Sequence, residues 1–181
     1  MHGTETPSSW IQRWAHLIAP GSCVLDLACG AGRHMQHLAG RGHALTGVDR
    51  SEQALATASA WGQTLLADIE NGPWPLTGRQ FGAVVVTHYL WRPLWPQILD
   101  SVAPGGVLLY ETFAQGHETV GRPARPDFLL TPGELLQVAA RGGLRVVAYE
   151  DGYEPSPERF VQRLAAVRET PADRPARYPL S

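Results

Sequence analysis

The stretch Val24-Leu-Asp-Leu-Ala-Cys-Gly-Ala-Gly-Arg33 decides the fold of this chain. An apolar strand ends in an acidic residue and closely spaced glycines, and an amphipathic segment follows over residues 34–39. Gly30 and Gly32 let the backbone approach a ligand or adopt a positive φ, where a Cβ would clash. The pattern predicts a loop that binds a nucleotide-type cofactor at the end of a buried strand.

A second acidic residue, Asp49, ends the next apolar run, which starts at His43. It lies 19 positions after Gly30, about where an acid that binds ribose hydroxyls is expected. The alternative is a tight structural turn with a helix-capping aspartate. The cofactor loop is favoured because a strand precedes it, a helix follows it and an acid ends the next strand.

Length and composition limit the classes of protein to which the chain can belong. The chain has 181 residues, which favours one domain with its own core. Its formal net charge of −2 does not attract phosphates, so no nucleic-acid partner is expected. Cys23 and Cys29 lack the spacing of a zinc site, so we expect reduced thiols and no metal. No targeting or membrane-spanning segment stands out, which favours a cytoplasmic monomer or homodimer.

The spacing of apolar residues predicts alternating strands and helices. Ser8 or Ser9 should cap the first helix, Ser51 the third, and Thr131-Pro-Gly-Glu134 predicts a capping box with proline at N1. The predicted helices cover residues 10–18, 33–39, 52–60, 93–102 and 131–140. The predicted strands cover residues 22–28, 43–49, 63–68, 81–88, 107–112, 144–149 and 160–168.

These elements predict an α/β fold, a single-domain Rossmann-like doubly wound sheet of seven strands with helices between the first six. The sheet should be mostly parallel with an antiparallel last strand, because only a short polar connection joins the last two. The core should cover about residues 8–168. Residues 114–130 are too long for an ordinary connection and are predicted to form a lid. The tail 170–181, rich in Pro and Arg, should be loose.

Over roughly residues 8–168 the chain resembles the class I S-adenosylmethionine-dependent methyltransferases. The stretches that carry the resemblance are Leu25-Asp-Leu-Ala-Cys-Gly-Ala-Gly32, Gly47-Val-Asp49, Ala67-Asp68-Ile69 and Ala103-Pro-Gly-Gly106. Gly32-Arg-His34, Glu111-Thr-Phe-Ala114 and Asp127-Phe-Leu-Leu130 are similar to small bacterial methyltransferases allied to the tellurite-resistance type. Ala28 departs from the class, which usually has its first glycine there.

The resemblance implies S-adenosylmethionine as the cofactor and S-adenosylhomocysteine as its product. Asp26 would organise the methionine amino group through the loop, Asp49 would bind the ribose hydroxyls, and Asp68 would accept from the adenine N6. The remaining cofactor candidates line the loop, flank the adenine or close the methionine end, and they are Ala28, Gly30, Gly32, Arg50, Ile69, Thr87 and His88.

Candidates for the acceptor chemistry lie at the carboxyl ends of the fourth and fifth strands, where open α/β sheets bind ligands. They are His88, Tyr89, Glu111 and His117. His88 is the strongest candidate for a base because imidazole titrates near neutrality, but it could equally only hydrogen-bond the cofactor or a loop.

Each of the other candidates also has a structural interpretation. Glu111 could pair with an arginine of the insert, Arg122 or Arg125, and His117 is expected on the surface of a mobile loop. Packing or capping roles are expected for His34 and His37, because no third metal ligand is in view. Trp91 and Trp95 either wall an acceptor pocket with Tyr89 and Phe113 or pack in the core.

Thr87-His-Tyr-Leu90 stands where amino-group methyltransferases have an Asn-Pro-Pro-Tyr type of motif, so adenine and glutamine acceptors are not expected. The predicted function is methyl transfer to a small-molecule or soft chalcogen acceptor, by in-line displacement and mainly through positioning. One alternative is a protein that binds S-adenosylmethionine, or activates a partner, without turnover. Another is a nicotinamide-dependent oxidoreductase, because Rossmann-type loops share the glycine turn and the ribose acid. The missing substrate domain and the antiparallel last strands argue against it.

Overall fold

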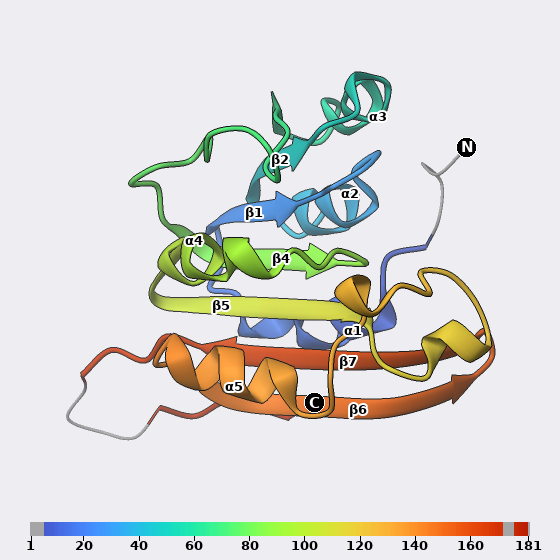
Figure 1. Cartoon of the computed structure of the whole chain (residues 1–181). Helices are drawn as coiled ribbons and strands as arrows, with labels where there is room; N and C mark the ends of the chain where they lie inside the picture. Colours follow the sequence, from blue (N-terminus) through green and yellow to red (C-terminus); the bar gives the residue numbers. More distant parts are fainter. Residues whose placement is uncertain (1–5, 172–175, 181) are drawn as a thin grey trace.

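A computed structural model of the chain describes residues 6–171 and 176–180, and Figure 1 shows one twisted sheet with helices packed against it. The seven strands lie in the order β3-β2-β1-β4-β5-β7-β6. Strands β1 to β5 pair in parallel, and β7 is antiparallel to both β5 and β6. The strands are β1 (Cys23–Leu27), β2 (Ala44–Asp49), β3 (Gln63–Leu66), β4 (Phe81–Thr87), β5 (Val102–Phe113), β6 (Arg145–Pro155) and β7 (Glu158–Val167). The predicted fold class is confirmed.

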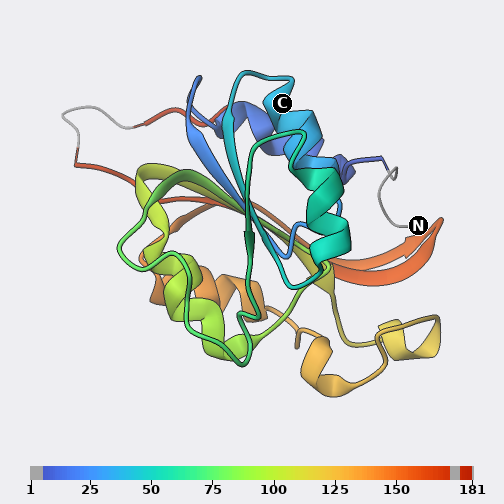
Figure 2. The ribbon, with the colours of Figure 1, turned by 90° about the horizontal axis from the view of Figure 1, so that it is seen from above.

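Helices cover both faces of the sheet (Figure 2). The α-helices are α1 (Ser9–Trp14), α2 (Arg33–Ala39), α3 (Glu52–Ala58), α4 (Trp95–Asp100) and α5 (Glu134–Arg141). Short 3-10 turns are η1 (Ala15–Leu17), η2 (Arg92–Leu94), η3 (His117–Thr119) and η4 (Pro126–Phe128). The first three α-helices pack on one face, and α4 and α5 pack on the other.

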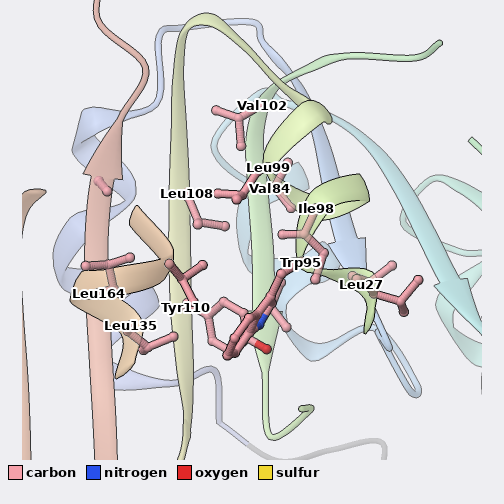
Figure 3. Packing of buried hydrophobic residues seen from close by; sticks show 14 of the residues in the cluster. Leu27, Val84, Trp95, Ile98, Leu99, Val102, Leu108, Tyr110, Leu135 and Leu164 are labelled. Atoms are coloured by element: carbon pink, nitrogen blue, oxygen red, sulfur yellow. The ribbon is translucent and has the colours of Figure 1, made fainter. Parts of the chain in front are cut away.

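Two apolar layers hold the helices on the sheet, because successive residues of a buried strand point to opposite faces. On one face Trp95, Tyr110 and Leu135 join α4 and α5 to β5 (Figure 3). On the other face Trp10 and Trp14 of α1 pack in the second buried cluster. The Trp10 indole N–H also donates to the Leu164 carbonyl of β7 at 3.1 Å, which ties the first helix to the last strand.

Local signals predicted several element boundaries. Helix α2 has the bounds that the sequence predicts. The Ser8 hydroxyl accepts from the Trp10 N–H at 3.1 Å, and the Ser51 hydroxyl accepts from the Ala54 N–H at 3.2 Å. Both predicted N-caps are confirmed, because a serine oxygen satisfies an otherwise unpaired N–H of the first turn.

Other predictions about the elements were wrong. No helix joins β3 to β4, because glycines and prolines interrupt the described residues 67–80 with turns. Strand β5 begins at Val102 and not at Val107, since residues 103–106 continue the strand past a register shift against β4. The connection expected after residue 149 is also strand, and β6 and β7 form one long hairpin that turns at Ser156 and Pro157.

The start of α5 also differs from the expected capping box. The helix begins at Glu134, and Gly133, with a φ of 73°, takes the N-cap position. The Glu134 carboxylate accepts from the Thr131 N–H at 2.7 Å, which is the expected half of the box. The Thr131 hydroxyl donates to the same carboxylate at 3.1 Å, so it does not accept from a backbone N–H of the helix.

Part of the tail packs against the domain. The Tyr178 hydroxyl donates to Glu169 at 3.2 Å, and the Arg145 guanidinium lies 5.1 Å from the centre of the Tyr178 ring. His16 contacts the Pro179 carbonyl through Nε2 at 2.9 Å. The predicted loose tail is therefore wrong at residues 178–179, and residues 172–175 and 181 lie outside the described part of the chain. Among the described residues, no helix has the length and apolar character needed to cross a bilayer.

Candidate active site

The candidate site is a cleft at the carboxyl ends of β1, β2 and β4, beside the turn that follows β3. A cavity of about 210 Å³ is bordered by Asp49, Asp68 and Ile69, and a second of about 150 Å³ is bordered by the glycine loop and Thr87. Ala28 borders both cavities. Sites that enclose a drug-sized ligand measure about 300 Å³ or more, so a ligand of cofactor size would occupy both.

The glycine loop has three residues with positive φ. Gly30 and Gly32 have φ values of 53° and 82°, which glycine adopts without strain. Ala28, at the position where the resemblance expects a glycine, has a φ of 54°. A left-handed conformation costs an alanine roughly 1–2 kcal/mol. The loop therefore keeps the glycine backbone path at this position and carries strain for it.

Gly47 of β2 lets the glycine loop and α2 lie close to the sheet. A Cβ on Gly47 would lie 2.8 Å from Cys29 Sγ and closer still to Met35 Sδ. Such contacts are shorter than atoms tolerate, so a larger residue would push α2 and the loop outward. Close packing against Cys29 and Met35 thus explains why a glycine stands at position 47 of the motif that ends at Asp49.

Asp49 ends β2 and holds the glycine loop against it. Its Oδ2 accepts from the Gly30 N–H at 2.8 Å, and its Oδ1 accepts from the Ser51 N–H at 2.9 Å. Each oxygen keeps a further lone pair, and the residue borders the larger cavity beside Arg50. The carboxylate is thus held rigidly where the sequence predicts the ribose acid.

Asp26 is a buried carboxyl group beneath the loop. It is 1% exposed, and neither oxygen has a hydrogen-bond partner among the described residues. Burial raises the pKa of Asp26 to about 7; the Arg33 charge opposes this rise and the Asp49 charge adds to it. A buried acid without a partner is costly, and a cationic group bound nearby would favour its charged form.

Asp68 caps its own turn after β3. Its Oδ1 accepts from the Glu70 N–H at 3.0 Å, and its Oδ2 accepts from the Asn71 side-chain amide at 3.0 Å. These hydrogen bonds, led by that from the Asn71 side chain, hold the pKa of Asp68 below its usual range. Ile69 is buried behind it. The sequence did not predict this turn, and the structure places Asp68 and Ile69 at the border of the larger cavity.

His34 links the smaller cavity to the start of α1. Its Nε2 accepts from the Ser8 N–H at 3.1 Å, and its Nδ1 lies 3.4 Å from the Thr87 hydroxyl. Burial lowers the pKa of His34 to about 3, so the ring is neutral at pH 7. Burial also lowers the pKa of His37, which lies on the same helix. Among the described residues no group of three or more His, Cys, Asp and Glu side chains is arranged to hold a metal ion.

His88 lies directly after β4 and borders the smaller cavity beside the end of β5. Its φ of 52° is unusual for a residue other than glycine and marks strain. Its Nδ1 lies 3.3 Å from an Arg33 guanidinium nitrogen, and its Nε2 lies 3.8 Å from Glu111 Oε1. Because the guanidinium can only donate, the neutral ring in this arrangement carries its proton on Nε2.

Glu111 lies behind His88 rather than in the cleft. It is 1% exposed, and its Oε2 accepts from Arg163 Nε of β7 at 2.5 Å. The expected pairing with Arg122 or Arg125 was wrong, because the β5–β7 register places Arg163 directly opposite Glu111. The other oxygen, Oε1, is buried without a hydrogen-bond partner and faces His88. Glu111 therefore acts on a ligand only through His88.

The expectation that His117 lies on the surface was wrong. It is 4% exposed, its ring stacks on Phe113 at 4.2 Å between centroids, and its Nε2 contacts the Arg122 carbonyl at 3.0 Å. Phe113 in turn stacks on His88 at 5.0 Å. The three rings form a column that joins the insert to the end of β4.

A third cavity, of about 280 Å³, lies beyond His88 and is called here the acceptor cavity. Its walls include Tyr89 and Phe113, as expected, and Pro123 and Phe128 of the insert, which sequence reasoning missed. Glu70 also borders it. Tyr89 and Glu70 border the larger cofactor cavity as well, so the two cavities adjoin at these residues. Trp95 packs in the core and Trp91 against it, and neither borders this cavity.

Arg92 holds the end of the insert, and nothing in the local sequence predicted this. Its Nε donates to Glu134 at 2.7 Å, and its two terminal nitrogens donate to the carbonyls of Asp127 and Leu129 at 2.8 and 2.9 Å. The hydrogen bond with Glu134 raises the pKa of Arg92, which stays charged. Phe128 therefore lies in a segment that a charged side chain fixes to the domain.

Comparison with known families indicates the kind of domain that contains the cleft. The sequence profile described as "Methyltransferase domain" matches residues 24–106, from β1 and the glycine loop through Asp49, Asp68 and β4. The resemblance of the chain to the class I S-adenosylmethionine-dependent methyltransferases is confirmed. S-adenosylmethionine is the cofactor of this family, and the matched segment contains the proposed cofactor residues. The described carboxylates, the positive-φ loop and the unpartnered Asp26 suit a ligand that has hydroxyls and positive charge.

Known proteins of similar sequence and structure agree with this assignment. The chain is 29% identical to a tRNA U34 carboxymethyltransferase of Klebsiella pneumoniae over 150 residues, which cover 72% of this chain and 42% of that protein. This chain thus spans less than half the length of the curated relatives it matches. The structure of TehB from Haemophilus influenzae superposes with a TM-score of 0.71 at 19% identity, covering 91% of this chain and 63% of TehB. A TehB-like methyltransferase from Corynebacterium glutamicum gives 0.64 at 17% identity, covering 90% and 89%. These structures share the fold.

Proposed function

We propose that this methyltransferase transfers a methyl group from S-adenosylmethionine to a small-molecule acceptor in the cytoplasm. The observation that carries the proposal is the acceptor cavity, which adjoins the cofactor cleft at His88 and Tyr89 and is bordered by Pro123 and Phe128 of the insert. A volume of about 280 Å³ suits a small molecule. The free thiols of Cys23 and Cys29 suit a reducing compartment.

The chain's own residues would hold the cofactor along the cleft. Asp49 would accept hydrogen bonds from the ribose hydroxyls with its remaining lone pairs. Asp68 would accept from the adenine amino group beside Ile69 and Ala67. Asp26 would favour the positively charged end of the cofactor from beneath the loop.

The remaining cofactor candidates shape the cleft. The loop backbone at Ala28, Gly30 and Gly32 would line the cofactor. Arg50 would lie beside the ribose, and Thr87 would close the methionine end.

The bound cofactor supplies a methyl group on a positively charged sulfur, which keeps the electrons of the broken bond as the acceptor's lone pair forms the new one. Because this methyl is already activated, the protein needs mainly to align the acceptor and exclude water. The stacked rings of His88, Phe113 and His117 fix one wall of the cavity, and Phe128 covers another side. Positioning is thus the main contribution of the chain.

His88 would act as a base only when Nδ1 is free to accept a proton. Arg33 donates to Nδ1 in this structure and also borders the smaller cavity. An anionic group bound there would compete for the guanidinium and release Nδ1. Glu111 Oε1, at 3.8 Å from Nε2, would then stabilise the imidazolium that forms. Glu111 is thus a positioning residue, and Tyr89 shapes the cavity between cofactor and acceptor.

A tRNA acceptor is the second candidate, and the observation that favours it is the similarity to proteins named tRNA U34 carboxymethyltransferase. The net charge of −2 gives no general attraction to a polyanion. The two candidate acceptors differ greatly in size, so a methyl label on a small molecule can be distinguished from a label on tRNA.

The test is to incubate the protein with S-adenosylmethionine labelled on its methyl group, together with a small-molecule extract or with purified tRNA. The proposal expects label in small molecules, formation of S-adenosylhomocysteine and no label in tRNA. Label in tRNA alone would contradict it. Binding of S-adenosylmethionine without transfer to either pool would favour the alternative of a protein that binds the cofactor without turnover.

A further inference from the structure

The walls of the acceptor cavity combine flat apolar faces with a single carboxylate. Tyr89, Phe113 and Phe128 provide the rings, and Pro123 and Leu90 provide further apolar surface. Glu70 is half-buried at the border with the cofactor cleft. Rings of this kind attract planar groups and, through their faces, cations.

The charge around the cavity is negative. The Glu70 carboxylate lies near the Tyr89 hydroxyl, and burial together with that carboxylate raises the pKa of Tyr89, so the phenol stays protonated. Behind His88 lies Glu111, whose buried Oε1 has no hydrogen-bond partner among the described residues. Among the residues that the structure describes, no arginine borders the acceptor cavity, and the sequence contains no lysine. An anionic ligand would therefore meet the Glu70 carboxylate and no arginine or lysine at the described cavity wall.

Arginines around this region already pair with other groups, and Arg125 of the insert, which lies 5.3 Å from the centre of the Phe128 ring, pairs with Asp127. Arg163 pairs with Glu111, Glu150 and Glu154. Arg159 pairs with Glu154 and lies 3.9 Å from Glu111 Oε1. Arg33 faces the other cavity, where it contacts His88. None of these arginines is among the residues that border the acceptor cavity, where Glu70 is the carboxylate.

We propose, on the basis of the proposed function above, that the acceptor is a small amine with an aromatic or apolar body, which enters as a cation. Glu70 holds the ammonium group, and the rings of Tyr89, Phe113 and Phe128 hold the body. This inference names the substrate class of the acceptor cavity and excludes oxyanions and phosphorylated acceptors from it.

The proposed acceptor class also gives His88 a defined task. An ammonium ion has no free lone pair, so it must first lose a proton, and His88 is the titratable base at the cavity wall. The nitrogen lone pair then forms the bond to the methyl carbon, while the sulfur keeps the electron pair of the bond that breaks. The products are the methylated amine, the thioether and the proton that His88 passes to water.

The test compares three ligands with the same phenyl ring and similar chains: phenethylamine, phenethyl alcohol and hydrocinnamate. Calorimetric titration into the full chain saturated with S-adenosylhomocysteine should show the amine binding at least about tenfold more tightly than the alcohol, and hydrocinnamate binding most weakly. Equal or tighter binding of hydrocinnamate would overturn the proposal, and so would absence of binding by all three.

Two variants assign the preference to the cavity. Glu70→Gln should lower the affinity for phenethylamine about tenfold and change that for the alcohol by less than about threefold. Glu52→Gln removes the same charge from exposed α3 and should change neither. An unchanged amine preference in Glu70→Gln would overturn the assignment. Failure of S-adenosylhomocysteine itself to bind would instead overturn the proposed function, which separates the two results.

Discussion

The two halves of the cleft are built in different ways. The cofactor half lies at the ends of β1, β2 and β3, and the acceptor half lies at the ends of β4 and β5. In the cofactor half backbone N–H groups fix two of the acids: Gly30 and Ser51 donate to Asp49, and Glu70 and Asn71 donate to Asp68. In the acceptor half the contacts come from the insert and from β7. The first half is therefore defined by local sequence, and the second by long-range packing.

This difference bears on function because the two halves have different requirements. A cofactor common to many proteins needs one arrangement of hydroxyl and amine partners, which a short loop and two acids supply. An acceptor is recognised by the shape and charge of a cavity, which here depend on Phe128 and on the register of β7. The predictions below test whether each half acts separately.

The largest expected effect falls on the acceptor half. His88→Asn should lower turnover by at least about 100-fold, because the base is lost, and leave the affinity for S-adenosylhomocysteine within about threefold. Asparagine tolerates the positive φ of this position. Turnover is measured as S-adenosylhomocysteine formed with an acceptor found by screening. Lost cofactor affinity would move His88 to the cofactor half, and unchanged turnover would remove its role as a base.

The matching test in the cofactor half is Asp49→Ala. Loss of a charged hydrogen-bond partner should weaken binding of S-adenosylhomocysteine by about 10- to 100-fold. The control is Asp127→Ala, which removes an exposed carboxylate of the insert and should leave that affinity unchanged. Calorimetry gives the affinities, and circular dichroism shows whether the fold is retained. Equal affinities for wild type and Asp49→Ala would contradict the ribose assignment.

Asp26, in the cofactor half, makes the free energy of unfolding depend on pH. The folded chain keeps the Asp26 proton up to about pH 7, whereas the unfolded chain releases it near the ordinary value of 3.8. Stability therefore falls as pH rises between these values, and Asp26→Asn removes this loss. The gain from Asp26→Asn should be about 2 kcal/mol larger at about pH 8 than at about pH 5.5.

This gain is measured as the free energy of unfolding at both pH values. The control is Asp100→Asn, an exposed aspartate of α4, which should show no such difference. A gain from Asp26→Asn that is equal at both pH values would show that the carboxyl is not buried as described. The same variant should bind S-adenosylmethionine more weakly, because the buried negative charge is lost.

A smaller effect is expected at Ala28 in the loop. Ala28→Gly relieves the left-handed strain and should stabilise the fold by about 1 kcal/mol, which raises the melting temperature by about 2–4 °C. Ala31→Gly changes the same residue type at a position that does not have a positive φ, so it should destabilise by about 0.5–1 kcal/mol. Destabilisation by both would show that Ala28 carries no strain.

The smallest expected effect concerns the lid that residues 114–130 are proposed to form. Arg92 and the His117 stack already hold this segment, so ligand binding should slow its cleavage only severalfold. Limited proteolysis with and without S-adenosylhomocysteine, followed by mass spectrometry, measures this change. Equal cleavage in both samples would show that the insert does not respond to the cofactor.

The two halves also differ in how far the sequence predicts them. Asp49, Ser51 and the glycines lie in short patterns with local physical reasons, so their places follow from spacing alone. Glu111 pairs with Arg163 because strand register brings together residues 52 positions apart, and no local pattern encodes that register. Likewise His117 is polar and lies in a loop, yet Phe113 and the Arg122 carbonyl bury it.

The central claim is that the cleft from Asp49 to His88 binds S-adenosylmethionine. Calorimetric titration of the full chain with S-adenosylmethionine and S-adenosylhomocysteine, with NADH as the control, tests it most directly. The account predicts micromolar binding of both sulfur compounds and none of NADH. Binding of NADH alone would contradict the account and favour an oxidoreductase, and failure of all three to bind would contradict a functional cofactor site.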